Sequence, residues 1–228
     1  GNNINDFWSS LAEGRCGIDH IKGFEDYELP ISVAGQVKNF SPEENGLERN
    51  DIRRNDLYCQ FALAAAYQAM QQSGLKSGEN IDADRLGVYI GSGIGGMNTF
   101  VTETTKLIQE GVNRISPLFV PMMIGNIAAG NVAIKYNAQG VCLPVVTACA
   151  TGTHAAGEAY RAIKHGYADA IICGGSEACI HPLAIGGFAN SKALSRSEDP
   201  KKASIPFNVN RNGFVMGEGA GILIFESL

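Results

Sequence analysis

The chain has 228 residues, of which 45% are apolar and 18% charged, and its formal net charge is −5 at pH 7. A chain of this length can bury one sizeable core or two small ones, and its mildly acidic balance disfavours general nucleic-acid binding. No apolar run is long enough to cross a bilayer, and the first residues lack a secretory signal pattern. The six cysteines show no CxxC spacing and the four histidines are scattered. We therefore expect no zinc site, no disulfide framework and no membrane, and a reducing, cytoplasmic setting.

The first fifty residues contain one clear helical pattern. Residues 4–13 carry apolar side chains at helical spacing, and Gly14 follows as a helix end. Residues 15–50 contain prolines and several glycines. They predict a loop with one short strand near residues 31–37.

A long helix is predicted for residues 55–73, because apolar residues recur at helical spacing and Gly74 closes the run. Arg53 and Arg54 precede it. Taken alone, this pair is most simply interpreted as two solvated charges.

A glycine-rich turn follows the next predicted strand. Residues 86–90 predict a strand, residues 91–96 read GSGIGG, and residues 97–110 predict a helix. The turn matches the G-x-G-x-x-G pattern of dinucleotide-binding folds, which would place a pyrophosphate on the helix N-terminus. Two features count against this interpretation. Such a turn usually opens its domain, whereas here a long segment precedes it. The next strand should also end in an acidic residue, but the acid at the expected distance, Glu110, ends a predicted helix. The NAD-dependent dehydrogenase interpretation is therefore an alternative, not our first choice.

The chain is organised around Cys149. Residues 141–146 form a short β-branched run that predicts a buried strand, and an alanine-rich helical pattern continues through Ile163. A thiol at this junction meets the free N–H groups and positive dipole end of a helix, which favour thiolate. The arrangement is that of a nucleophile elbow with cysteine in place of serine. Most free cysteines are inert core residues, which is the simpler alternative.

His154 follows the cysteine by five residues on the same predicted helix. This separation is about 500° of helical turn, so the two side chains point well apart. We interpret His154 as a structural histidine. Downstream, residues 169–177 predict a strand with Cys173 in the core, and residues 222–225 predict a final buried strand.

The segment VTACATG at residues 146–152 resembles the active-site segment of the β-ketoacyl-acyl-carrier-protein synthases, most closely the type II elongation enzymes. Further matches occur in the expected order at residues 91–96, 116–121, 185–188 (IGGF, a loop in the family) and 211–221 (RNGFVMGEGAG). The last segment has Asn212 where the family usually has Asp, a minor departure. The resemblance covers essentially the whole chain.

The resemblance implies a role for several side chains. Ile94 occupies the position that bounds the acyl chain, Phe119 belongs to a segment that reaches across a two-fold axis into the partner's acyl channel, and Phe188 lies beside the nucleophile. Basic residues of the surface that docks the acidic carrier protein correspond to Arg53, Arg54 and Arg196.

The implied reaction is acyl transfer followed by condensation. Cys149 takes an acyl chain from acyl carrier protein, and its own N–H supplies one oxyanion donor. The acyl chain is then condensed with malonyl carrier protein, with loss of CO2. The resemblance implies no metal and no nucleotide cofactor. The family also uses two histidines and a lysine in HGTGT-type and NSFGFGGH-type motifs, which do not occur here.

We therefore expect residues 1–228 to be the N-terminal domain of a longer enzyme, without its first strand and C-terminal half, and inactive in condensation by itself. The expected fold is α/β and thiolase-like: a mixed sheet flanked by helices, with one buried helix bearing the nucleophile. The expected partners are acyl carrier protein and a second copy of the chain. The other alternative is a non-catalytic subunit like the chain-length factors of polyketide synthases, which lack the nucleophile.

Overall fold

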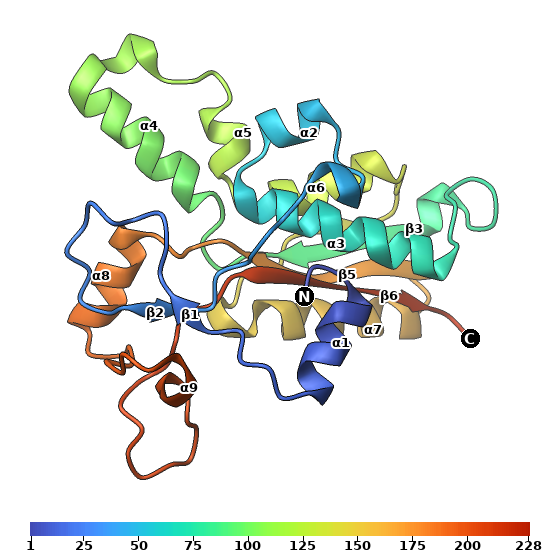
Figure 1. The fold of residues 1–228 in the computed structure, drawn as a ribbon. Coiled ribbons are helices and arrows are strands. Elements are labelled where there is room, and N and C mark those ends of the chain that lie inside the picture. The colour runs from blue at the N-terminus through green and yellow to red at the C-terminus, as the bar shows by residue number, and fades with distance from the viewer. The chain divides into compact units, whose positions relative to one another are not determined.

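The computed structural model describes residues 1–228 and divides into two compact units (Figure 1). The first unit comprises Gly1–Phe40 and Cys179–Glu218, and the second comprises Ser41–Ala178 and Gly219–Leu228. None of the helices combines the length and apolarity that crossing a membrane requires.

The second unit is built on a four-stranded mixed sheet. Its strands, in the order β4-β3-β5-β6, are β4 (Cys142–Leu143), β3 (Leu86–Gly91), β5 (Ala170–Glu177) and β6 (Gly219–Glu226). Strands β3, β4 and β5 run parallel, whereas β6 pairs with β5 in the antiparallel direction. Strand β3 is buried along its whole length, as expected for a central parallel strand that reads as an apolar run.

Helices cover both faces of this sheet. Helices α3 and α6 pack on one face and α7 packs on the other (Figure 1). Because strand side chains alternate between faces, Tyr89, Ile171 and Cys173 all point to α7, where they meet its buried alanine stripe. The helices of this unit are α2 (Arg49–Arg54), α3 (Leu57–Ser73), α4 (Met97–Glu110), α5 (Phe119–Met123), α6 (Ile127–Lys135) and α7 (Thr151–Lys164), with short 3-10 turns η1 (Glu43–Asn45), η2 (Ala83–Arg85), η3 (Val112–Arg114) and η4 (Ala148–Ala150).

One buried side chain caps two of these helices. The carboxylate of Asp56 accepts a hydrogen bond from the N–H of Tyr58 at the start of α3 (3.4 Å). It also accepts from both the N–H and the hydroxyl of Thr99 in the first turn of α4, each at 2.7 Å. Helix α3 therefore begins at Leu57, two residues later than its apolar pattern predicts, because Asp56 serves as its N-cap.

The first unit contains α1 (Ile4–Ala12), β1 (Asp19–His20), β2 (Val33–Ala34), α8 (Pro182–Asn190) and α9 (Pro200–Ala203). The two strands pair antiparallel. The IGGF segment, expected to be a loop, lies within α8. The side chain of His181 caps this helix by accepting from the N–H of Leu183, and Pro182 occupies its first turn. These two signals outweigh the low helix propensity of the glycines.

Several other expectations need correction. The strand expected at residues 141–146 is only two residues long and exposed, because β4 is an edge strand with a neighbour on one side only. Strand β6 is the opposite edge, and Leu223 is 54% exposed where a buried strand was expected. Arg53 and Arg54, which precede the long helix in the sequence, end a separate helix, α2.

Candidate active site

Three segments of the second unit lie at the carboxyl ends of its parallel strands. The glycine loop (residues 91–96) continues from β3, the cysteine turn (residues 147–150) follows β4, and Glu177 ends β5. Because parallel strands end at the same edge of a sheet, these segments come together there. This edge is where ligands bind in open α/β sheets.

Cys149 is exposed and lies in the 3-10 turn immediately before α7. The residue before it, Ala148, has a φ of 52°, in the left-handed region that L-residues rarely adopt. The expected elbow is therefore present, with its conformational strain at Ala148. Cys149 precedes the first residue of α7 by two positions, at the positive end of the helix dipole, which favours negative charge.

Hydrogen bonds fix the cysteine turn to the first turns of α7. The N–H of Thr147 donates to Oγ1 of Thr151 (2.9 Å), and Nδ1 of His154 lies 2.8 Å from Oγ1 of Thr147. This contact supports the interpretation of His154 as a structural histidine, because the imidazole holds Thr147, two positions before Cys149.

The other cysteines fall into two groups. Cys59, Cys173 and Cys179 are buried, as expected for Cys173. Burial raises the pKa of Cys59 to about 12 and that of Cys173 to about 11, so both are poor nucleophiles at neutral pH. Cys16 and Cys142 are exposed like Cys149, but neither lies at the start of a helix.

The glycine loop packs directly against the backbone on two sides. A Cβ atom at Gly91 would overlap the carbonyl oxygen of Val145, and one at Gly96 would overlap the carbonyl of Met122. Gly95 has a φ of 81°, and a Cβ there would be 2.8 Å from the carbonyl oxygen of Met123. Close backbone approach thus accounts for the glycines that matched a dinucleotide-binding pattern.

Sequence reasoning assigned no role to Glu177, which connects to the glycine loop. Its Oε1 accepts the hydroxyl of Ser92 (3.0 Å) and its Oε2 accepts the N–H of Gly93 (2.9 Å). Burial raises the pKa of this carboxyl, although the hydrogen bonds it accepts act in the opposite direction. The only sequence signal was an acid at the end of a buried strand.

Two of the predicted substrate-binding residues belong to the glycine loop and to a helix that is tied to it. Ile94 projects from the glycine loop and is 43% exposed. Phe119 begins α5 and is half-buried, with its ring centroid 6.4 Å from that of Phe100 on α4. The N–H of Gly96 donates to the carbonyl of Met123 (3.0 Å), which ties the end of α5 to the loop. The structure therefore brings the glycine loop, which carries Ile94, to the cysteine turn and ties the end of α5 to that loop, whereas a place for Phe119 in the site stays a prediction.

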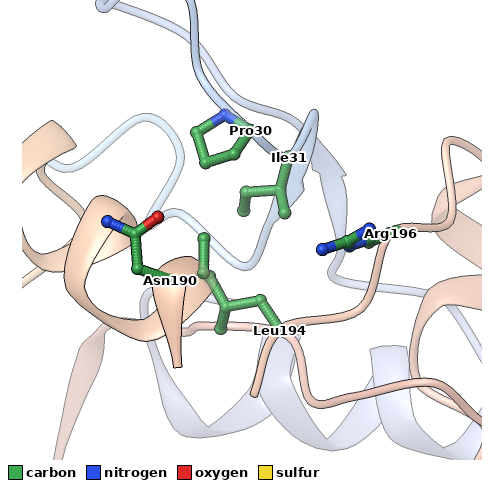
Figure 2. A pocket seen from close by; sticks show the side chains of 6 residues that line it. Pro30, Ile31, Asn190, Leu194 and Arg196 are labelled. Atoms are coloured by element: carbon green, nitrogen blue, oxygen red, sulfur yellow. The ribbon is translucent and has the colours of Figure 1, made fainter. Parts of the chain in front are cut away.

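Phe188 and Arg196 belong to the first unit, so their relation to Cys149 stays a prediction. The Phe188 ring packs edge to face against Phe214, with centroids 5.4 Å apart. Arg196 is exposed and lines one side of a pocket of about 320 Å³, with Asn190 on the opposite side (Figure 2). The pocket is lined by Pro30, Ile31, Ala189, Asn190, Leu194 and Arg196.

Arg53 and Arg54 are exposed at the C-terminal end of α2, in the second unit. Neither forms an ion pair within the chain. Both guanidinium groups are thus available to a partner. No group of three or more His, Cys, Asp or Glu side chains is placed to hold a metal ion.

The whole chain, residues 1–228, matches the family model described as "Beta-ketoacyl synthase, N-terminal domain". It is 46% identical over 229 residues to 3-oxoacyl-[acyl-carrier-protein] synthase 2 of Synechocystis sp., covering 100% of this chain and 55% of that protein. It is also 46% identical to the enzyme of the same name from Staphylococcus aureus, covering 56% of that protein. The chain thus spans about half the length of the curated relatives it matches.

Solved structures agree with this match. A β-ketoacyl synthase from Burkholderia phymatum superposes with a TM-score of 0.88 at 26% identity, over 98% of this chain and 55% of the other. The ketosynthase AntDE, solved in complex with a type II polyketide acyl-carrier protein, gives a TM-score of 0.85 at 34% identity, over 99% of this chain and 54% of the other. The expected α/β fold, a mixed sheet flanked by helices, is confirmed.

Proposed function

Because the chain belongs to the β-ketoacyl synthase family, we propose that it is the nucleophile-bearing part of a condensing enzyme of fatty-acid synthesis. The observation that carries this proposal is the position of Cys149, exposed on a strained turn at the start of α7. The two relatives of 46% identity are named as 3-oxoacyl-acyl-carrier-protein synthases, which supports fatty-acid synthesis as the setting.

The proposed reaction has two halves. The Cys149 thiolate attacks the thioester carbonyl of an acyl carrier protein, the carbon–sulfur bond to the carrier breaks, and the carrier sulfur leaves as thiolate while the acyl group passes to the cysteine. Malonyl carrier protein then loses CO2, and the carbanion so formed attacks the acyl-cysteine carbonyl. Cys149 leaves as thiolate, and the product is a 3-oxoacyl chain two carbons longer. The N-terminal amides of α7 favour the anionic sulfur at the start and end of this cycle.

Ile94 and Phe119 are proposed to contact the acyl chain, with Phe188 beside the nucleophile. The glycine loop supports the first part of this assignment, because its packing against the cysteine turn places Ile94 on the same edge of the sheet as Cys149. The partial exposure of Ile94 leaves an apolar side chain available to an apolar ligand.

The proposed partner is acyl carrier protein, in acyl and malonyl forms, docked through Arg53, Arg54 and Arg196. All three side chains are exposed cations, which suits an acidic partner. The complex of AntDE with a carrier protein supports this class of partner. Pairing of two copies of the chain is a further expectation from the family.

The test is transfer of an acyl group from a carrier-protein thioester, read by peptide mass spectrometry. We expect the mass of the acyl group on the Cys149 peptide of the unmodified chain and of Cys142→Ala, a matched change of an exposed cysteine. The same label should be absent from Cys149→Ala. A chain that takes no acyl group at Cys149 would favour a non-catalytic subunit of chain-length-factor type instead.

A further inference from the structure

Glu177 is a partly buried carboxylate that forms no ion pair. One of its oxygens accepts from the hydroxyl of Ser92, and the other accepts from the N–H of Gly93. We propose that Glu177 is a positioning residue, which fixes the glycine loop against the cysteine turn and thereby sets the place of Ile94. This inference rests on the proposed function for its consequence in acyl-chain selection.

Gly93 lies next to both Glu177 and Ala148, the residue before Cys149. A Cβ atom at Gly93 would be 2.9 Å from Oε2 of Glu177 and 3.7 Å from the carbonyl oxygen of Ala148. The space beside the Gly93 Cα is therefore lined by both the carboxylate and the cysteine turn. A change in the carboxylate reaches Ala148 through a single residue.

Ile94 lies between two residues that are tied to this carboxylate, Gly93 directly and Gly95 through Ser92. Ser92 is only 2% exposed. Its hydroxyl donates to Glu177 while accepting from the N–H of Gly95 (2.9 Å). The exposed side chain of Ile94 is thus carried by a loop that is anchored on both sides of that residue, at Ser92 and Gly93 before it and at Gly95 after it. Glu177 itself points to the loop, so it acts on substrate only through Ile94.

Glutamine at this position is the informative change, because it has the size of glutamate but one acceptor oxygen. If its carbonyl keeps the N–H of Gly93, its NH2 group must face Ser92. The Ser92 hydroxyl then accepts from two donors, and its own hydrogen loses its acceptor. E177Q thus weakens the anchor without opening a cavity.

Glu218 supplies a matched control in the first unit. Burial also raises the pKa of this carboxyl, and it accepts one backbone N–H, that of Val37, at 3.0 Å. E218Q is the same chemical change at a similar depth, in a residue that belongs to no proposed site.

The experiment compares the full 228-residue chain with E177Q and E218Q. Amide hydrogen exchange at residues 91–96 should accelerate about tenfold in E177Q, as expected for loss of one hydrogen bond to a charged group. The rate of Cys149 alkylation by iodoacetamide should change severalfold in the same variant. Both readouts should be unchanged in E218Q. Acceleration confined to the loop and cysteine turn supports positioning, whereas acceleration spread equally over β5 and β6 overturns it as a merely structural effect.

If E177Q does not fold, S92A replaces it, because this change removes one donor to the carboxylate and keeps Gly93. Unchanged loop exchange and alkylation in E177Q, or in S92A where it is used, overturn the inference.

Acylation of Cys149 distinguishes a failure of this inference from a failure of the proposed function. In variants that accept acyl groups, the ratio of long-chain to short-chain labelling of Cys149 should shift for E177Q and stay constant for E218Q. If wild-type Cys149 takes no acyl group, the proposed function fails, and exchange and alkylation alone decide the role of Glu177.

Discussion

The Cα of Gly91 faces the carbonyl oxygen of Val145 so closely that no side chain fits between them. This contact joins the end of β3 to the segment that leads into the cysteine turn. It brings the glycine loop close to the cysteine turn, which is why Ile94 and Cys149 lie at the same edge of the sheet.

Gly91→Ala should therefore destabilise the chain severely. The new Cβ would overlap both the Val145 carbonyl and the side chain of Thr151. The Val145 backbone cannot move aside as a flexible side chain could, so we expect the free energy of unfolding to decrease by at least about 3 kcal/mol. Urea unfolding followed by circular dichroism measures it.

Gly157→Ala is the matched control for that change. Gly157 lies within α7, is exposed, and has open space where a Cβ would be. Alanine there should stabilise the chain by about 0.5–1 kcal/mol, because it favours helix over the unfolded state. Equal effects of the two substitutions would show that the Gly91 contact does not constrain the fold.

The double cap at Asp56 gives a second prediction. Asp56→Ala removes the cap of α3 and leaves the buried N–H of Thr99 without its acceptor. We expect a loss of about 2–4 kcal/mol from these two effects together. Asp199→Ala, which removes an exposed cap from the short helix α9, should cost only about 0.5–1 kcal/mol. Chemical unfolding of both variants tests whether Asp56 supports two helices, since a loss no larger than that of Asp199→Ala would contradict it.

Local patterns predicted much of the second unit. Strand β3 and helix α4 have nearly the predicted bounds, because an apolar run and a glycine turn mark them in the sequence itself. Cys149 was chosen as the candidate nucleophile from a similar local pattern, and the turn and helix of that pattern are present, although its strand is shorter than expected. These features depend on neighbours within a few residues, which a sequence pattern contains.

Long-range contacts account for what the patterns missed. Glu177 acquires its role from Ser92, 85 residues away in the chain. A local signal was also missed: the family resemblance implied a loop at residues 185–188, whereas the cap from His181 begins a helix, α8, that continues through them. The exposure of β4 and β6 follows from their places at the sheet edges, which the apolar character of each run does not reveal.

Alkylation of the unmodified chain should separate its cysteines into two classes. Iodoacetamide should label Cys149 first, since it is exposed and lies beside helix N-terminal amides. Cys142 should react more slowly although its residue is exposed, because partial burial of the thiol raises its pKa. The three buried cysteines should react only after unfolding. Peptide mapping over time gives the order, and labelling of Cys142 ahead of Cys149 would contradict a special environment at the turn.

The raised pKa values of Glu177 and Glu218 predict a specific dependence of stability on pH. Burial raises both above the ordinary glutamate value of 4.5. The folded state therefore holds these protons at pH values where the unfolded state has released them. The stability that each group contributes is complete below its unfolded pKa and is lost as pH rises through its folded pKa.

The double variant E177Q/E218Q isolates this effect, because glutamine does not titrate. Other carboxyls act in the opposite direction. Lys38 lowers the pKa of Asp19 and Arg85 lowers that of Asp169, so the stability that these two groups contribute is lost as pH falls. Those groups are common to both proteins and cancel in the difference. The free energy of unfolding of the wild type, minus that of the double variant, should therefore decrease from about pH 4 to about pH 8. Urea unfolding across that range measures it, and a difference that stays flat or increases with pH would show that these two carboxyls are not destabilised in the folded chain.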